Sequence, residues 1–243
     1  LLENGVAVNV LATLTDYSVQ FPEETYSYFK SLGLNWMQFI PIVEPDPEDP
    51  TKAAPFSVSA EDYGKFLVEV FDLWLADFEN GQPTTHIRHF DSVFYAYVGL
   101  EPPECTMMKE CGPYVAVEHN GNVYSCDFFV EPKWKLGNIM HQRITAMLNS
   151  KKQKTFGVAK AVLPGECRRC PWLTKCYGGC TKDRIKDPRD KRKPRFCKSY
   201  KMFFAHADKT LSAMAENWKQ DQLDMQERQQ TGGTYNALKD FMG

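Results

Sequence analysis

Hydrophobic residues in the first part of the chain alternate between strand-like runs and helix-like spacing. The near-continuous apolar run over residues 5–14 (GVAVNVLATL) predicts a β-strand buried on both faces. A segment from Pro22 to Gly33 carries apolar residues at helical spacing, with proline at its start and glycine at its stop. A second apolar strand follows over residues 35–43. Strand, helix and strand form a βαβ unit, which predicts a parallel sheet with its helices outside.

The next segments predict a loop and two more helices. Residues 44–55 are acidic and rich in proline, so we expect a loop there. Residues 59–78 have a helical pattern that begins with Ser59 and Asp62 as a capping box. Residues 86–99 predict another helix, on which His86 and His89 would share a face. Because no third candidate ligand is close to these histidines in the sequence, we expect surface or packing roles for them.

Beyond residue 100 the regular pattern gives way to loops and turns. Residues 114–126 (YVAVEHNGNVYSC) alternate around an Asn-Gly pair, which predicts a β-hairpin. Residues 182–201 are distinctly basic, and we expect a solvated charged loop there. Residues 200–218 look helical, and the polar remainder is expected to be a loosely held tail. We therefore divide the chain into an α/β part, a cysteine-rich domain and a polar tail: residues 1–100, 101–218 and 219–243.

Composition narrows the possible partners. The formal net charge is −2 at pH 7, and this near-neutral balance disfavours nucleic acid as the main partner. No run of about 18 apolar residues is present, so we expect no membrane span. The sequence starts at Leu1, without methionine, and soon runs into a strand-like segment. We therefore expect a fragment that begins inside a domain.

Eight cysteines carry the candidate chemistry, and none lies in the first 104 or the last 46 residues: Cys105, Cys111, Cys126, Cys167, Cys170, Cys176, Cys180 and Cys197. Disulfides would require an oxidising compartment, for which the sequence gives no sign. Eight thiolates divide equally into two tetrahedral zinc sites. They also divide into two 4Fe–4S clusters, each with four cysteines. Spacing alone leaves zinc and iron open.

The order of the cysteines resembles a known domain. Cys111, Gly121 and Cys126 satisfy C-x9-G-x4-C, and C-x2-C-x5-C-x3-C and a lone Cys197 follow. This string resembles the SPASM domain of radical SAM peptide-modifying enzymes, which carries two auxiliary 4Fe–4S clusters. The segments QFIPIVE, CTMMKECGPYVAVEHNG and GNVYSCDFFVEPKWKLGNI resemble the anaerobic sulfatase-maturating enzymes of that group. The implied fold class is α/β: the C-terminal part of a partial TIM-like (β/α) radical SAM barrel followed by a loop-rich, cysteine-rich SPASM domain.

The resemblance also implies roles for individual residues. The ligands of the first auxiliary cluster would be Cys105, Cys111, Cys126 and Cys180. Those of the second would be Cys167, Cys170, Cys176 and Cys197. Asp127 matches the proposed general base of the family, whereas a solvated hairpin acid or a group that tunes the cluster is the alternative. Ile42 lies at a predicted strand end, where barrel enzymes keep their chemistry, and is a candidate contact of SAM.

Members of that family oxidise a cysteine or serine of a sulfatase to Cα-formylglycine without oxygen. The reaction removes a hydrogen atom from Cβ, a proton from oxygen or sulfur, and one further electron. The 5′-deoxyadenosyl radical from SAM would take the first, a carboxylate the second and an oxidised cluster the third. The implied partners are an unfolded sulfatase segment of the C/S-x-P/A-x-R type and a reducing protein such as flavodoxin or ferredoxin. The implied location is the cytoplasm, because the clusters need reducing conditions.

The sequence departs from the family in one respect. It contains no C-x3-C-x2-C, the motif that binds the SAM-cleaving cluster. We expect that motif in an N-terminal part of a longer enzyme, which would bind SAM and a third 4Fe–4S cluster, and we expect this piece alone not to cleave SAM. Three other functions stay open: another SPASM peptide modifier, a two-cluster electron-transfer protein, and a zinc-binding interaction domain.

Overall fold

A three-stranded parallel sheet forms the first part of the fold in the computed structural model, which describes residues 1–49, 52–112, 114–185 and 194–239. Its strands are β1 (Val10–Leu14), β2 (Trp36–Pro41) and β5 (His86–Ile87), in the order β1-β2-β5. Helix α1 (Pro22–Ser31) connects β1 to β2, which pair in parallel. The predicted βαβ unit is therefore confirmed.

Strand β1 is shorter and less buried than the sequence predicts. It begins at Val10, and a 3-10 turn, η1 (Leu2–Asn4), lies upstream of it. Its side chains alternate in burial: Leu14 is 1% exposed, whereas Leu11 is 65% exposed. The expectation of a strand buried on both faces is therefore wrong. The apolar residues of one face line an open hollow, described below, instead of a packed core.

Helix α2 (Ala60–Ala76) starts as the sequence predicts. Ser59 is the N-cap, and its hydroxyl oxygen accepts a hydrogen bond from the backbone N–H of Asp62. The Ser59 hydroxyl in turn donates to the Asp62 carboxylate over 2.6 Å. This capping satisfies one of the free N–H groups of the first turn. The loop predicted before α2 is present in the described residues on either side of positions 50–51, with one β-bridge between Pro45 and Ala53.

Helix α3 (Arg88–Val98) begins two residues later than predicted, because His86 pairs with Trp36 in the sheet. His86 and His89 therefore share no helical face, which corrects that prediction. The His86 ring stacks on Trp36 at 4.0 Å between centroids, and its Nδ1 lies 3.3 Å from the Asp91 carboxylate. His89 is buried instead. Both histidines thus have the packing roles that the sequence favoured.

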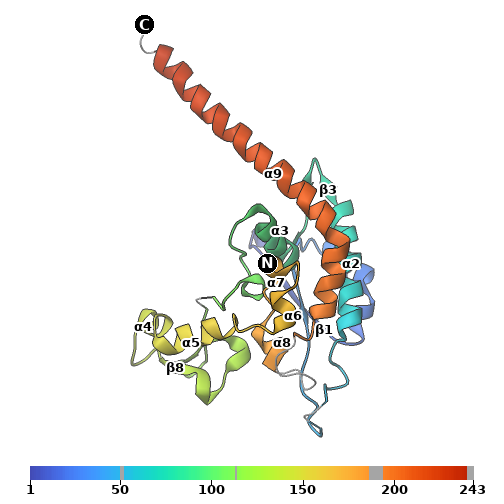
Figure 1. The fold of residues 1–243 in the computed structure, drawn as a ribbon, viewed down its shortest axis with the longest axis vertical. Coiled ribbons are helices and arrows are strands. Elements are labelled where there is room, and N and C mark those ends of the chain that lie inside the picture. Colours follow the sequence, from blue (N-terminus) through green and yellow to red (C-terminus); the bar gives the residue numbers. More distant parts are fainter. Residues whose placement is uncertain (50–51, 113, 186–193, 240–243) are drawn as a thin grey trace.

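Helix α9 (Cys197–Lys239) is the largest difference between prediction and structure. It spans 43 residues, so the helix predicted over residues 200–218 continues through most of the segment that we expected to be a polar tail. The first half of α9 packs along α2 and α3, and the second half extends away from the body of the protein (Figure 1). The residues of the second half are mostly good helix formers, which explains why a polar segment continues the helix.

The core of the protein is aromatic and joins the two ends of the chain. The Phe203 ring of α9 lies 5.4 Å from the ring centroids of both Phe71 and Phe90. Each of these three side chains is at most 1% exposed. Such aromatic pairs stabilise a core beyond the area that they bury. The segment after the last cysteine therefore completes the core of the α/β part.

The cysteine-rich part is built from short elements. The predicted hairpin is confirmed: β6 (Ala116–Val117) and β7 (Asn122–Tyr124) pair around Gly121, whose φ is +79°. A third strand, β8 (Lys135–Asn138), pairs with β7. The helices are α4 (Ile144–Leu148), α5 (Lys151–Ala159), α6 (Gly165–Arg168), α7 (Leu173–Cys176) and α8 (Thr181–Ile185). The remaining short elements are η2 (Ser18–Gln20), β3 (Phe78–Glu79), β4 (Gln82–Pro83), η3 (Cys105–Met107), η4 (Asp127–Phe129) and η5 (Pro132–Trp134).

Candidate cofactor sites and the cavity between them and the sheet

The eight cysteines are free thiols and gather in two sets of four. The first set lines one hollow: Cys105, Cys111, Cys126 and Cys180. The second set lines another: Cys167, Cys170, Cys176 and Cys197. The two sets interleave along the sequence, because the last member of the C-x2-C-x5-C-x3-C run belongs to the first set. The structure thus brings together the same groups of residues that the family resemblance implied.

Loops that other elements hold in place present the first set. Cys105 opens the turn η3, and Cys126 follows β7 and caps η4. The backbone N–H of Cys111 donates to the Gly157 carbonyl of α5 over 3.1 Å. A Cβ atom at Gly157 would lie 3.1 Å from the Cys111 carbonyl oxygen, so glycine permits this close approach. Helix α5 therefore fixes the loop that carries Cys111.

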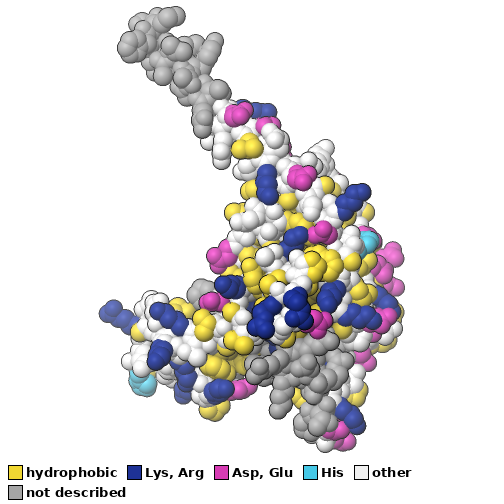
Figure 2. All heavy atoms as spheres, in the orientation of Figure 1, with side chains coloured by type: hydrophobic (Ala, Val, Ile, Leu, Met, Phe, Trp, Pro, Cys, Tyr) yellow, Lys and Arg dark blue, Asp and Glu magenta, His cyan; other side chains and the backbone are white. Residues whose placement is uncertain are grey.

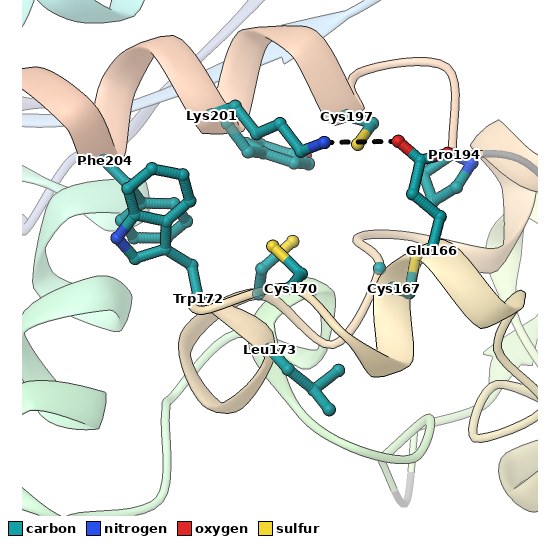
Figure 3. Close-up of a pocket in the computed structure, with 12 residues that line it drawn as sticks. Glu166, Cys167, Cys170, Trp172, Leu173, Pro194, Cys197, Lys201 and Phe204 are labelled. Atoms are coloured by element: carbon teal, nitrogen blue, oxygen red, sulfur yellow. Dashed lines mark hydrogen bonds and ion pairs between the residues drawn. The ribbon is translucent and has the colours of Figure 1, made fainter.

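The second set lies between helices (Figure 3). Cys167 is on α6, Cys176 ends α7, and Cys197 starts α9. The rings of Trp172 and Phe204 stack at 5.9 Å beside this hollow. This makes the second hollow an extension of the aromatic core.

Helical side chains with charge border the second hollow. Lys201 of α9 pairs with Glu166 of α6 over 3.2 Å across its edge (Figure 3). Lysine and arginine side chains gather on the surface over α6 and the start of α9 (Figure 2). The edge of the second hollow is therefore polar, whereas its lining is apolar.

A sharp turn directs neighbouring cysteines into different hollows. Between Cys176 and Cys180 the residues Tyr177, Gly178 and Gly179 all have positive φ, at 45°, 75° and 64°. A Cβ atom at Gly179 would lie 2.9 Å from the Tyr200 ring, so only glycine fits there. The left-handed conformation ends a helix, and it is rare for residues other than glycine. Three such residues in succession therefore change the direction of the chain after α7. Cys176 therefore faces the second hollow and Cys180 the first.

Three of the thiols, Cys126, Cys176 and Cys180, lie where a negative charge is unfavourable unless a metal is present. Burial raises the pKa of Cys126 to about 12, and the adjacent Asp127 carboxylate adds to the shift. Burial likewise raises the pKa of Cys176 to about 11, and it raises the pKa of Cys180 well above its usual value. A bound metal reverses this preference, since a coordinating thiol is deprotonated. Binding of a metal centre is therefore what would convert these thiols to thiolates.

The donor set fits an iron–sulfur cluster. Four cysteine sulfurs are the usual ligands of a 4Fe–4S cluster. The four cysteines of each set line one hollow. In the described ranges, no three His, Cys, Asp or Glu side chains converge closely enough to hold a single metal ion. An iron–sulfur cluster is wider than a single ion and spreads its four ligands around itself.

The first hollow also opens toward the sheet. Its volume is about 420 Å³, and Leu11, Gln38 and Ile40 line it from β1 and β2. Asp127 lines the same hollow and has an exposed side chain. Its Oδ1 accepts a hydrogen bond from the Cys126 thiol over 3.1 Å. The candidate base therefore lies between the first set of cysteines and the open face of the strands.

Ile42 lies just beyond the end of β2. Its backbone N–H donates to the Leu14 carbonyl, and its carbonyl accepts from the Val58 N–H, each over 2.9 Å. Its side chain is half-buried and is not among the residues that line the two cysteine hollows. The contact between Ile42 and SAM therefore stays a prediction.

The sequence interpretation missed two buried cations close to the thiols, Lys160 and Arg184, which are 0% and 4% exposed. Arg184 falls within the basic stretch for which we expected a solvated loop. In the structure its neighbours Lys182 and Asp183 are buried with it on α8, so that expectation is wrong for the start of the stretch. Residues 186–193 of the stretch lie outside the described residues. The sequence carries no local signal for the burial of Lys160 and Arg184, because lysine and arginine are mostly exposed and hydrophobic periodicity does not detect isolated buried cations.

Comparisons with known proteins find a matching domain model and similar sequences. Residues 105–171 match the model of the SPASM iron–sulfur cluster-binding domain. The chain is 34% identical over 256 residues to the serine-type anaerobic sulfatase-maturating enzyme of Bacteroides thetaiotaomicron, covering 99% of this chain and 59% of that protein. It is also 34% identical over 215 residues to the cysteine-type enzyme of Clostridium perfringens, covering 88% and 58%.

A solved structure extends the likeness from sequence to fold. The structure titled "Native anSMEcpe with bound AdoMet" superposes with a TM-score of 0.78 at 32% identity and covers 89% of this chain and 59% of that one. The chain belongs to the anaerobic sulfatase-maturating enzyme family. It spans about 59% of the length of the first of these relatives. The family fold confirms the α/β class, with part of a radical SAM barrel followed by a SPASM domain.

Across the described residues, no helix combines the length and the apolar character needed to cross a bilayer.

Proposed function

We propose that this chain supplies the auxiliary clusters and the general base for oxygen-independent maturation of sulfatases. The observation that carries the proposal is the position of Asp127. Its carboxylate lies in one hollow of about 420 Å³ together with the thiols of the first set and the strand residues Leu11 and Ile40. Two of the three agents that the reaction requires, a proton acceptor and a site for an electron acceptor, thus share one space.

The chemistry assigns a task to Asp127. Conversion of a CH2–OH group to an aldehyde, or of CH2–SH to a thioaldehyde that water then exchanges, removes one hydrogen atom, one proton and one electron. When bound, SAM supplies the radical that takes the hydrogen atom, and an oxidised 4Fe–4S cluster accepts the electron. Asp127 takes the proton from the substrate oxygen or sulfur. Because its side chain is exposed to the cavity, a substrate segment can reach Asp127 without any opening of the fold.

The remaining assignments follow from the same resemblance. The first and second cysteine sets hold one auxiliary cluster each, and SAM with a third cluster belongs to the whole protein. Relatives named for serine and for cysteine match the chain equally, so either residue is a suitable target. A further matching structure is titled with a bound Cp18Cys peptide, which supports an unfolded sulfatase segment as the substrate. A flavodoxin-like or ferredoxin-like reductant and a cytoplasmic location complete the proposal.

The first test is the metal content of the anaerobically purified chain. We expect about eight irons with matching sulfide per chain, because two clusters are each held by four cysteines. About two zinc ions without sulfide, as all-cysteine tetrahedral sites require, would contradict the clusters and leave an interaction domain.

The second test is Asp127→Asn in the full-length protein. We expect cleavage of SAM to continue and formylglycine formation on a sulfatase peptide to fall about 10²- to 10⁴-fold, the range of general acid–base catalysis. The matched control is Glu131→Gln, an exposed acid in the same loop. An equal loss of formylglycine formation in both variants, or an unchanged rate in Asp127→Asn, would show that Asp127 is not the general base.

A further inference from the structure

Lys160 is held as a cation at the first set of cysteines. It follows helix α5, its side chain is completely buried, and its Nζ donates to the backbone carbonyls of Cys105, Thr106 and Met108. The contacts to Thr106 and Met108 measure 2.8 and 2.5 Å. Three acceptors use all three hydrogens of an ammonium group, whereas a neutral amine has only two. The geometry therefore requires the protonated form.

Arg184 continues the same network beside the first set. Its Nη1 donates to the Lys160 carbonyl over 2.9 Å. Its Nη2 donates to the Thr181 hydroxyl over 3.3 Å, and that hydroxyl lies 3.6 Å from the Cys111 sulfur. The guanidinium keeps its charge in proteins. The Thr181 hydroxyl thus connects this second cation to Cys111, a candidate cluster ligand.

The two cations differ in which thiols surround them. Burial lowers the pKa of each, and nearby thiols oppose that shift. The thiols that act on Lys160 belong to the first set: Cys111, Cys105 and Cys180. Those that act on Arg184 come from both sets: Cys111, Cys180, Cys167 and Cys176. The contacts agree with this difference. A Cβ atom at Gly178, which lines the second hollow, would lie 4.0 Å from Arg184 Nη1, whereas Lys160 Nζ binds the loop that carries Cys105 of the first set.

Burial of two cations costs free energy unless anions compensate for it. A 4Fe–4S cluster with four thiolates is such an anion, and its reduction adds one further negative charge. A cation fixed nearby stabilises the reduced form more than the oxidised form, so it raises the reduction potential. Low dielectric around both buried side chains strengthens this effect.

We propose that Arg184 is a shared countercharge that raises the reduction potentials of both auxiliary clusters, and that Lys160 does so for the first cluster alone. This inference rests on the proposed function, because it presumes that the two sets hold clusters. Its consequence for the reaction is that each cluster accepts an electron more readily. The residues act through the clusters, so they tune the site and do not touch the substrate.

The test is an anaerobic redox titration followed by electron paramagnetic resonance on the cluster-loaded, full-length protein. Signals are assigned with Cys105→Ala and Cys170→Ala, which each disrupt one set, and a signal that changes on addition of SAM belongs to the third cluster. We expect Arg184→Met to lower both midpoint potentials and Lys160→Met to lower only the first. A tenfold change in the ratio of oxidised to reduced cluster is expected, which corresponds to about 59 mV for one electron.

Charge-conserving variants separate charge from packing. Arg184→Lys and Lys160→Arg should stay near the wild-type potentials, as should the exposed controls Arg143→Met and Lys154→Met. The resonance signal reports assembled clusters only, so partial loading does not obscure the shift. If Arg184→Met assembles no cluster while Arg184→Lys assembles both, the need for charge is upheld.

Three results would overturn the inference: no shift in Arg184→Met, a shift confined to one cluster, or equal shifts in Arg184→Met and Arg184→Lys. These results are distinct from failure of the proposed function, which the iron and sulfide content of the wild-type protein reveals beforehand.

Discussion

Each of the two hollows is lined by four cysteines, but the surroundings of the two sets differ. The first hollow opens to the sheet and is built from loops, with the exposed Asp127 at its side. The second lies between α6, α7 and α9 and shares aromatic side chains such as Phe204 with the core. The first hollow has a volume of about 420 Å³ and the second about 30 Å³. A large hollow suits contact with a substrate, whereas a small one that shares side chains with the core depends on the packing of that core. The difference predicts that damage to the core affects the second hollow more than the first.

Phe203→Ala should produce the largest difference between the two hollows. Phe203 is fully buried next to Phe204, and removal of a buried phenylalanine costs about 3–5 kcal/mol in unfolding free energy. We expect lower occupancy of the second cluster with the first retained, measured as iron content and resonance signals. The matched control is Tyr28→Ala, an aromatic residue that is 60% exposed. Equal loss of both clusters would show that the hollows are not independent.

Gly179→Ala tests the turn that separates the two sets. We expect a cost of about 1–3 kcal/mol, because the new side chain meets the Tyr200 ring and must adopt a left-handed backbone. Gly81→Ala is a control with similar positive φ and open space around its Cβ position, so it isolates the backbone cost. Chemical denaturation under anaerobic conditions measures both. If the two variants are equally stable, the contact with Tyr200 does not constrain the turn.

His89 gives the core behind the second hollow a dependence on pH. Burial lowers its pKa to about 4, below the unfolded value of about 6.5. Between these values the unfolded chain binds the proton more readily, so stability falls as the pH falls. We expect a loss of about 1 kcal/mol from pH 7 to pH 5.5. Denaturation of His89→Gln should lack this component, whereas the exposed control His141→Gln should keep it.

The smallest effect is expected for the far half of α9. Its residues from Lys219 to Gln229 are mostly exposed and line neither cysteine hollow. A chain that ends after Gln220 should therefore change the unfolding free energy by at most about 0.5 kcal/mol and keep both clusters. A larger loss would mean that this half of the helix stabilises the fold.

Local chemistry made part of the fold predictable. The βαβ unit followed from apolar runs, the start of α2 from Ser59, and the hairpin from the Asn-Gly pair, because each is determined by neighbouring residues. The extent of α9 was not predictable in this way. Its polar half has no apolar stripe that faces a core, and its helical conformation follows from propensity and from the packed half before it.

The candidate sites were predictable to a similar degree. The spacing of the cysteines made all eight candidate ligands, and the family resemblance was needed to divide them into two sets, because Cys176 and Cys180 are close in sequence but face different hollows. The buried Lys160 and Arg184 escaped notice, because lysine and arginine are rarely buried and nothing local indicates that they are. The exposure of Leu11 was missed for the converse reason: it is apolar and yet lines an open hollow.

The packing of α9 on α2 has a consequence for biosynthesis. The hydrogen bond from Ser199 to the Ala60 carbonyl joins residues 139 positions apart, and Leu211 is part of the same core. The face of α2 that packs on α9 therefore stays uncovered until residues as far as Leu211 have been synthesised. Cys197, the first residue of α9, belongs to the same late segment. The second hollow thus takes shape only when α9 reaches α2, well after Cys167, Cys170 and Cys176 have been made.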